Sequence, residues 1–240
     1  KEKFLMISGI GCSSRFPYYM DTYGFHSIHG RAPALASGAK IANPDLSVWV
    51  ITGDGDAMSI GGNHFIHVLR RNIDMNILMF NNRIYGLTKG QYSPTSEVGK
   101  ITKSTPMGSL DYPFNPPQLA LGASGTFIAR TIDREQKHMG PILEEAHKHK
   151  GTSFVEIYQN CNIFNDGAFS DLTEKETKAE TQLVLEQGEP MIFGAENNKG
   201  LILDGSNFKV VKLGSHYNAD DILKHDKKDK NLAMLLSEIT

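Results

Sequence analysis

Two short polar stretches carry the residues of this 240-residue sequence that are best suited to chemistry. Gly-Asp-Gly-Asp occupies positions 53–56 and Asn-Asn occupies positions 81–82, and each directly follows an apolar run typical of a buried strand. A helical stretch separates the two runs, so parallel pairing would bring both polar stretches to the carboxyl edge of one sheet. There the Asp54 carboxylate, the Asn82 amide oxygen and the backbone carbonyl of Ile84 can bind one hard cation such as Mg²⁺.

Both stretches also have a simpler interpretation. Gly-Asp-Gly alone is typical of a tight turn, and a single asparagine after a strand is typical of a cap. The strand–helix–strand context, with Asn82 placed 28 residues after Asp54, favours the metal site. The two glycines support it, because glycine permits a sharp turn and the close approach of a ligand to the backbone.

The elements that must position these residues follow an alternating pattern. Strand-like apolar runs alternate with amphipathic stretches over about the first 160 residues, which predicts an α/β fold with a mostly parallel sheet and helices on both faces. The expected strands are 4–9, 47–53, 75–81, 125–130 and 152–158, and the expected helices are 31–42, 61–71, 116–121 (with Asn115 as N-cap) and 134–149. Two irregular segments, 84–113 and 159–173, are long enough to be functional loops.

The composition changes after Asp171. A polar helix is predicted over 173–187, followed by short strands near 191–193, 201–203 and 208–211 and an amphipathic stretch at 232–239. We therefore expect a main domain over 1–170 and a small β-rich C-terminal extension over 171–240 that packs on a partner. The mixed charges of 225–230 indicate a solvated face.

Composition excludes several classes of protein. Twenty-seven acidic against 25 basic residues give a net charge of -2, which argues against a nucleic-acid binder that works by positive charge. No run approaches the roughly 18 apolar residues of a membrane span, and no signal-peptide pattern opens the chain. Two cysteines cannot form a disulfide framework. A cytoplasmic protein is expected, and the strand-like run only three residues after the start suggests that residues precede Lys1.

The Gly-Asp-Gly and Asn-Asn arrangement resembles the thiamine diphosphate motif. Further stretches narrow the resemblance: GIGCSSR at 9–15, IHGR at 28–31, YGLTKGQYSPT at 85–95, PFNP at 113–116 and SFVE at 153–156. Together they resemble the β subunit of 2-oxoacid:ferredoxin oxidoreductases, most closely of those acting on 2-oxoglutarate. The resemblance covers nearly the whole chain.

The resemblance implies that thiamine diphosphate and Mg²⁺ bind at this edge of the sheet. Asp54, Asn82 and the Ile84 carbonyl would bind Mg²⁺, and His29, just before a predicted helix, would donate to a diphosphate oxygen. Asp56 would orient the metal ligands. Asn63 and His64 are weaker candidates for lining the site. A lone histidine is as often a structural residue. The expected cofactor-binding residues are Gly53, Asp54, Gly55, Asp56, His29, Gly30, Asn82, Ile84, Gly86, Leu87 and Thr88.

Two basic residues are candidates for catalytic roles at a negatively charged substrate. Lys89 lies in a glycine-flanked loop, and Arg15 would present a planar guanidinium to a carboxylate. A dicarboxylate such as 2-oxoglutarate would need a cationic partner at each end. Either residue can also be an ordinary surface charge.

Cys12 and Cys161 alone are typical of buried thiols. The resemblance implies that they are two of four ligands of a [4Fe–4S] cluster, whose other two ligands come from a Cys-x-x-Cys motif that this sequence lacks. Either that pair lies upstream of Lys1, which we expect, or the cluster is lost.

The implied activity is the coenzyme A-dependent oxidative decarboxylation of 2-oxoglutarate, or its reverse, with electrons passing through the cluster to ferredoxin. An α subunit would supply the pyrimidine-binding domain and its glutamate, and two αβ units would pair as (αβ)2. The alternatives are a non-redox thiamine diphosphate-dependent decarboxylase or carboligase and a non-catalytic assembly subunit. A nicotinamide-binding protein is disfavoured, because no Gly-x-Gly-x-x-Gly opens a helix after a strand. The sequence leaves open which 2-oxoacid is preferred, in which direction the reaction runs physiologically, and which ferredoxin accepts the electrons.

Overall fold

The computed structural model describes residues 1–214 and 216–239. The chain divides into two compact units, Lys1–Ala168 and Phe169–Thr240. Each unit has a hydrophobic core of its own. The chemistry predicted from the sequence falls within unit 1.

Unit 1, all of whose residues are described, contains a six-stranded sheet in the order β2-β1-β3-β4-β6-β5. Every pair of neighbouring strands is parallel, as the alternating pattern predicted. β3 and β4 are neighbours, and the last residue of β3, Gly53, pairs with Phe80. The premise of the metal site is therefore confirmed: the two polar stretches follow adjacent strands at one edge. The strands are β1 Phe4–Ser8, β2 Tyr23–His26, β3 Ser47–Gly53, β4 Met75–Asn81, β5 Phe127–Ile132 and β6 Thr152–Tyr158.

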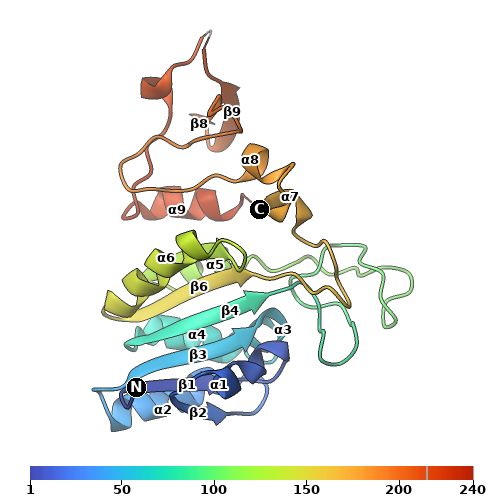
Figure 1. The fold of residues 1–240 in the computed structure, drawn as a ribbon, viewed down its shortest axis with the longest axis vertical. Coiled ribbons are helices and arrows are strands. Elements are labelled where there is room, and N and C mark those ends of the chain that lie inside the picture. Colours follow the sequence, from blue (N-terminus) through green and yellow to red (C-terminus); the bar gives the residue numbers. More distant parts are fainter. Residues whose placement is uncertain (215, 240) are drawn as a thin grey trace. The chain divides into compact units, whose positions relative to one another are not determined.

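Helices cover both faces of this sheet (Figure 1). One face packs against α2 (Ala32–Ala42), α3 (Asp54–Met58), α4 (Gly62–Arg71) and α5 (Pro116–Gly122), around a core that includes Phe65 and Phe154. The other face packs against α6 (Gln136–Lys148) and against Phe16 of the short helix α1 (Phe16–Tyr19), which follows the 3₁₀ turn Cys12–Arg15. The predicted α/β fold is confirmed.

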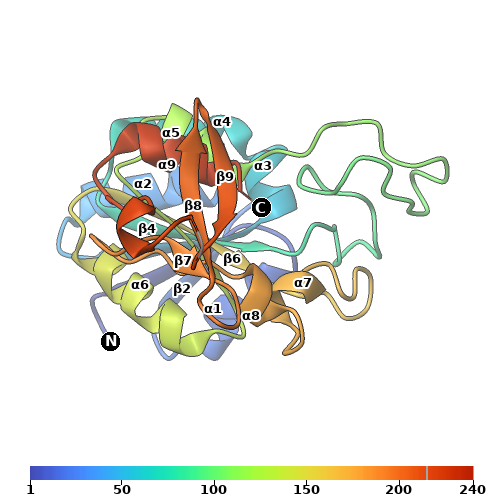
Figure 2. The same cartoon turned by 90° about the horizontal axis from the view of Figure 1, so that it is seen from above.

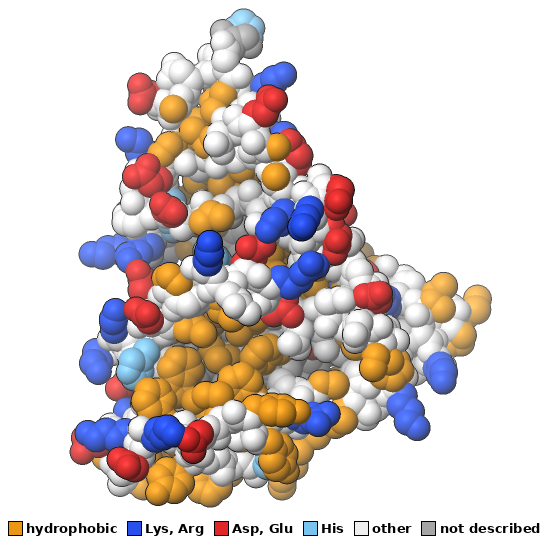
Figure 3. All heavy atoms as spheres, in the orientation of Figure 1, with side chains coloured by type: hydrophobic (Ala, Val, Ile, Leu, Met, Phe, Trp, Pro, Cys, Tyr) orange, Lys and Arg blue, Asp and Glu red, His pale blue; other side chains and the backbone are white. Residues whose placement is uncertain are grey.

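The face that carries α6 shows a gathering of hydrophobic side chains (Figure 3). Phe4, Phe16 and Phe80 pack there against the buried residues of the sheet but stay partly exposed. Successive side chains of each strand point to opposite faces of the sheet, so the sheet of unit 1 has an apolar layer on each face.

The five strands and four helices expected over the first 160 residues agree with the structure to within about two residues at each end. Asn115 caps α5 as predicted, because its side chain accepts a hydrogen bond from the backbone N–H of Gln118 at 3.2 Å. β2 was not predicted. That edge strand is only four residues long and each of its residues is exposed, so it lacks the run of apolar residues that is typical of a buried strand.

Residues 84–113 contain no helix or strand longer than an isolated bridge, as expected. The segment extends outward beyond the carboxyl ends of the strands (Figure 2). Its base is held by the pair Arg83–Glu97 at 2.9 Å and by a contact between Lys100 and Asn165.

In the described part of unit 2, β7 (Ile192–Phe193), β8 (Lys199–Asp204) and β9 (Asn207–Lys212) form an antiparallel sheet. Gly205, at φ 66°, lies in the hairpin turn between β8 and β9. This sheet packs with α9 (Lys230–Ser237), and a 3₁₀ turn spans Ala219–Asp221. The small β-rich extension is confirmed.

The predicted helix over 173–187 is wrong. The structure has two four-residue helices, α7 (Ser170–Thr173) and α8 (Lys178–Thr181), and an extended backbone at Glu174 and Gln182. Residues 173–182 carry no apolar side chain larger than that of Ala179, and a helix without an apolar face to bury gains little from packing. Among the described residues, no helix is long and apolar enough to cross a bilayer.

Candidate active site

Asp54 is the first residue of α3, directly after the end of β3. Its side chain is buried and accepts a hydrogen bond from the Thr95 hydroxyl at 2.7 Å. Burial raises the pKa of the Asp54 carboxyl, because the low-dielectric surroundings disfavour the charged form. A cation bound beside it would hold the carboxylate in its ionised form.

Gly55 permits a close contact that no other residue allows. A Cβ added there would lie 2.6 Å from Cζ of Tyr85, whose hydroxyl donates to the Gly55 carbonyl at 3.0 Å. The ring of Tyr85 thus packs directly on the backbone of the Gly-Asp-Gly turn. Burial raises the pKa of the Tyr85 phenol, so this group stays a hydrogen-bond donor.

Asn82 and Ile84 follow the end of β4 in a tight turn. The Asn82 amide oxygen accepts from the Ile84 N–H at 3.2 Å, and the residue between them, Arg83, has a φ of 53° in the left-handed region. Both Asn82 and Ile84 are buried. The adjacency of β3 and β4 places this turn beside Asp54, so the site offers a carboxylate, an amide oxygen and a carbonyl.

Asp56 joins three segments that are distant in sequence. Its carboxylate accepts from the N–H groups of Ile10 (3.1 Å) and Gly30 (2.7 Å), from the Thr52 hydroxyl (2.6 Å) and from His29 Nδ1 (2.7 Å). These contacts connect the loops after β1 and β2 to the end of β3. The prediction that Asp56 orients the site agrees with this geometry.

His29 lines the cavity described below and is oriented by Asp56. With Nδ1 directed at that carboxylate, Nε2 is the nitrogen left to meet a ligand. Gly30, at φ 72°, does not line the cavity, and a Cβ there would lie 2.5 Å from the backbone nitrogen of Gly61. Its role in the structure is to let two loops approach each other and to donate to Asp56.

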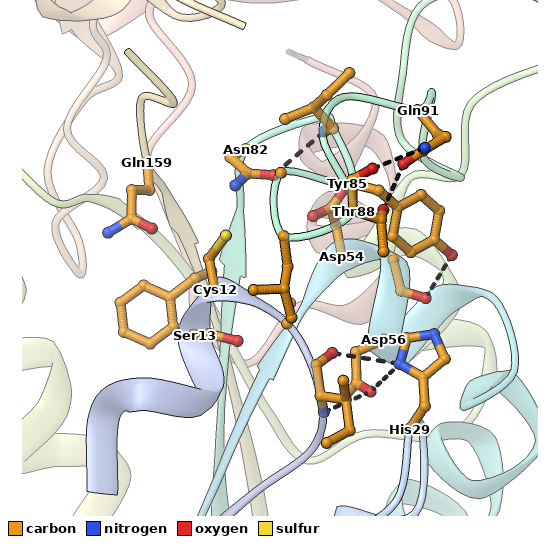
Figure 4. Close-up of a pocket in the computed structure, with 18 of the residues that line it drawn as sticks. Cys12, Ser13, His29, Asp54, Asp56, Asn82, Tyr85, Thr88, Gln91 and Gln159 are labelled. Carbon is orange, nitrogen blue, oxygen red and sulfur yellow. Dashed lines mark hydrogen bonds and ion pairs between the residues drawn. The ribbon is translucent and has the colours of Figure 1, made fainter. Parts of the chain in front are cut away.

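These residues surround one cavity of about 510 Å³ (Figure 4). Ten of the predicted cofactor residues line it: Gly53, Asp54, Gly55, Asp56, His29, Asn82, Ile84, Gly86, Leu87 and Thr88. Several other side chains that line the cavity were not predicted as site residues, among them Ser13, Gln91, Tyr92 and Gln159. The first three of these lie in stretches that carry the family resemblance, and Gln159, directly after β6, lies in none of them.

Lys89 and Arg15 lie outside this cavity. Lys89 is exposed, at φ 76°, on the loop whose neighbours Leu87 and Thr88 line it. Arg15 is exposed, with its guanidinium 6.0 Å from the ring centre of Tyr19. Their catalytic roles stay predictions. Asn63 and His64 do not line the cavity either, and His64 contacts Arg31.

The two cysteines come together at Gly86. A Cβ added at Gly86 would lie 3.2 Å from Cys12 Sγ and 3.6 Å from Cys161 Sγ, so the two thiols flank a residue that lines the cavity. Burial and the neighbouring Cys161 raise the pKa of the Cys12 thiol. Among the described residues, no group of three or more His, Cys, Asp or Glu side chains is arranged to hold a metal ion.

Polar residues from two loops hold the turn at 82–84 in place. Ser96 donates through its hydroxyl to the Arg83 carbonyl at 2.6 Å, and the Asn165 amide donates to the Asn82 carbonyl at 2.9 Å. Thr95 is the last residue of the YSPT stretch and Ser96 follows it, so the family resemblance of that stretch could have pointed to both residues. Nothing in the sequence pointed to Asn165, because only the fold brings it close to the Asn-Asn stretch.

The residues present fit a hard cation and a diphosphate. The metal donors are all oxygens, as Mg²⁺ prefers, and they number three, which leaves positions for phosphate oxygens and water. Gly53 and Gly55 form a glycine cradle at the start of α3, where a Cβ at Gly55 would collide with Tyr85. We conclude that Asp54, Asn82 and Ile84 suit the group implied by the motif.

Comparisons with known proteins agree with this site. A family model described as "Thiamine pyrophosphate enzyme, C-terminal TPP binding domain" matches residues 9–157. The chain is 57% identical over 242 residues to the 2-oxoglutarate oxidoreductase subunit KorB of Mycobacterium tuberculosis, covering 100% of this chain and 64% of the relative. It is 44% identical over 161 residues to the 2-oxoglutarate synthase subunit KorB of Archaeoglobus fulgidus, covering 67% and 60%.

A solved structure is similar as well. The 2-oxoglutarate:ferredoxin oxidoreductase of Magnetococcus marinus, with 2-oxoglutarate, coenzyme A and succinyl-CoA bound, matches with a TM-score of 0.67 at 45% identity. The match covers 68% of this chain and 56% of that one. The chain thus spans somewhat less than two thirds of the length of these relatives.

The predicted resemblance to 2-oxoacid:ferredoxin oxidoreductases is confirmed by these relatives. The family match extends from the loop after β1 to the end of β6, and it includes every residue of the metal turn and the glycine cradle. The chain belongs to the family of thiamine pyrophosphate enzymes, and residues 9–157 are its C-terminal TPP-binding domain.

Proposed function

We propose that this chain is the β subunit of a 2-oxoglutarate:ferredoxin oxidoreductase, which carries out the coenzyme A-dependent oxidative decarboxylation of 2-oxoglutarate or its reverse. One observation carries the proposal: the Cys12 and Cys161 sulfurs flank Gly86, two residues after the proposed metal ligand Ile84, at the same cavity. Thiols beside a thiamine site favour redox chemistry over a non-redox decarboxylase. The names of the relatives support the substrate.

Thiamine diphosphate, when bound, supplies the electron sink for loss of CO2 from a 2-oxoacid. Asp54, Asn82 and the Ile84 carbonyl would hold the Mg²⁺ that neutralises the diphosphate. His29, fixed by Asp56, would offer Nε2 to a diphosphate oxygen, and it can donate there only when the ring carries both protons.

A [4Fe–4S] cluster is part of the proposal. Cys12 and Cys161 would supply two of its four thiolates, and a Cys-x-x-Cys segment outside these 240 residues would supply the others. The raised pKa of Cys12 belongs to the thiol without iron, and a coordinating thiol is deprotonated by the metal.

The partners are proposed from the same site. Ile28, Ile60 and Leu87 are 76%, 53% and 56% exposed around the cavity and the loops that form it, which is costly for apolar side chains left in water. We propose that an α subunit with the pyrimidine-binding domain covers them, that residues 171–240 pack on a partner, and that the assembly is (αβ)2. Ferredoxin is the proposed electron acceptor and coenzyme A the acyl acceptor, and the expected cytoplasmic location stays a prediction.

The test uses the native complex, purified without oxygen. 2-Oxoglutarate is added with and without coenzyme A, and reduction of a viologen dye is followed. Reduction that depends on coenzyme A supports the proposed reaction and substrate together. Absence of reduction with any 2-oxoacid, in protein that contains bound thiamine diphosphate, would refute the redox function.

A further inference from the structure

Glu156 is a fully buried carboxylate in the middle of β6, and it does not line the cavity. Its Oε2 accepts from Arg130 Nε at 2.7 Å, and its Oε1 accepts from Asn81 Nδ2 at 2.8 Å. A carboxylate is costly to bury unless both oxygens have partners. Strand positions of this kind are normally apolar, and Glu156 instead forms a buried ion pair with Arg130.

Glu156 determines which way the Asn81 amide faces. An ionised carboxylate only accepts hydrogen bonds, so Asn81 must direct its NH2 group at Glu156. The amide oxygen therefore points the opposite way, where it accepts from the Arg83 N–H at 3.1 Å and lies 3.0 Å from the Thr95 hydroxyl. A flipped amide would direct its NH2 group at the Arg83 N–H, which is also a donor.

Those two contacts reach both sides of the metal site. Arg83 is the left-handed residue between the metal ligands Asn82 and Ile84, so its N–H bond to Asn81 fixes the turn that presents them. The Thr95 hydroxyl lies 2.7 Å from Asp54 Oδ2. The Asn81 oxygen therefore contacts the metal turn directly, through the Arg83 N–H, and contacts the carboxylate ligand Asp54 indirectly, through the Thr95 hydroxyl.

We propose that Glu156 is a positioning residue for the metal–diphosphate site and that it acts through the orientation of the Asn81 amide. The inference rests on the proposed function only in that Mg²⁺ binds at Asp54, Asn82 and Ile84. Glu156 touches neither cofactor nor substrate in this account. Its effect is on the geometry of the donors.

Glu156→Gln should weaken metal binding without changing the size of the side chain. In this variant the amide oxygen of Gln should accept from the charged Arg130 guanidinium, because hydrogen bonds from a charged donor are stronger than those from a neutral one. The new amide's NH2 then faces the NH2 of Asn81, and Asn81 must flip and lose its bond to the Arg83 N–H. Loss of one buried hydrogen bond of this kind corresponds to about tenfold in affinity.

The double substitution Asn81→Asp with Glu156→Gln exchanges donor and acceptor. The glutamine oxygen accepts from Arg130, its NH2 donates to the new carboxylate at 81, and the other oxygen of that carboxylate accepts from the Arg83 N–H and faces Thr95. Every hydrogen bond is restored with the charge on the other residue. The double variant should therefore bind metal more tightly than Glu156→Gln alone, because the substitutions at two contacting residues compensate each other.

Thr152→Val is the matched control on the same strand. Thr152 is fully buried, and its hydroxyl donates to the Ile73 carbonyl at 2.7 Å, so the variant also loses a buried hydrogen bond in β6. It should unfold at a lower temperature and keep the wild-type metal affinity. A purely structural role for Glu156 would give the same result as this control.

The measurement is Mn²⁺ binding by electron paramagnetic resonance, in the assembled complex freed of divalent metal and supplied with thiamine diphosphate. We expect Glu156→Gln to bind Mn²⁺ about tenfold more weakly and the double variant to recover. Wild-type affinity in Glu156→Gln, or no recovery in the double variant, overturns the inference. If Glu156→Gln does not assemble, the double variant decides alone: a complex that assembles but binds Mn²⁺ about tenfold more weakly than the wild type overturns the inference. A wild-type complex that binds no Mn²⁺ refutes the metal site of the proposed function itself.

Discussion

Gly9→Ala tests whether Asp56 is as rigidly held as its contacts indicate. A Cβ at position 9 would lie 2.5 Å from Asp56 Cγ and nearer still to one carboxylate oxygen. Carbon atoms in normal contact are about 3.5 Å apart, so the carboxylate must retreat by about 1 Å. It cannot do so and keep its bonds of 2.6–3.1 Å to Ile10, Gly30 and Thr52.

The cost follows from the number of bonds that break. A hydrogen bond to a charged group contributes about 1.5–3 kcal/mol, so the loss of two costs about 3–6 kcal/mol. This penalty falls on the loops after β1 and β2, which Asp56 connects to the end of β3. An opening free energy that is lower by about 3 kcal/mol corresponds to about a hundredfold faster opening of those loops.

The assay is hydrogen–deuterium exchange of the assembled complex, read by mass spectrometry on peptides that cover 9–11 and 28–31. Gly38→Ala is the control, since Gly38 lies inside α2 and a Cβ there meets nothing within 4 Å among the described residues apart from the adjoining backbone of that helix. That control should leave these peptides unchanged and stabilise the helix by about 0.5–1 kcal/mol. Exchange in Gly9→Ala within about threefold of the wild type, less than 1 kcal/mol, would refute the reasoning.

Three further predictions concern the thiols, the metal and a helix cap. Cys12→Ser or Cys161→Ser should abolish viologen reduction and leave thiamine diphosphate binding intact by calorimetry; retained reduction would show that the thiols are not on the electron path. Because burial raises the pKa of Asp54 and Mg²⁺ needs its ionised form, affinity should begin to fall on acidification at a higher pH than an exposed aspartate would give, which a calorimetric pH series can show or contradict. Asn115→Ala removes the cap of α5 and should cost about 1 kcal/mol of unfolding free energy, measured by chemical denaturation of the complex; no change would mean that the cap is not stabilising.

The metal site was predictable because it depends on local rules. Asp54 and Asn82 stand at the ends of two buried runs, and parallel pairing through a helix brings such ends to one edge whatever the loops do. The glycines of the cradle, Gly53 and Gly55, were predictable for the same reason, because they lie at the end of the first of these runs. Strand periodicity, not any distant contact, locates these residues.

The residues that complete the site depend on contacts between distant loops. Asn165 reaches the Asn82 carbonyl from 83 residues away, and no spacing rule connects the two positions. Lys89 shows the opposite case, since its sequence context suggests a ligand contact but its side chain is exposed outside the cavity. Loop conformation decides both, and loops have no periodicity from which it can be predicted.

The bond from Asn165 to Asn82 has a thermodynamic consequence. Asn165 also donates its backbone N–H to the Cys161 carbonyl at 2.9 Å, so one short turn joins a proposed cluster ligand to the metal turn. Binding events that order the same segment are linked reciprocally: whatever iron at Cys161 adds to the affinity for metal and diphosphate, those ligands add to the affinity for iron. Loading of the two cofactors would then be cooperative, and protein that has lost one would release the other more readily, so that partly loaded complexes are scarce.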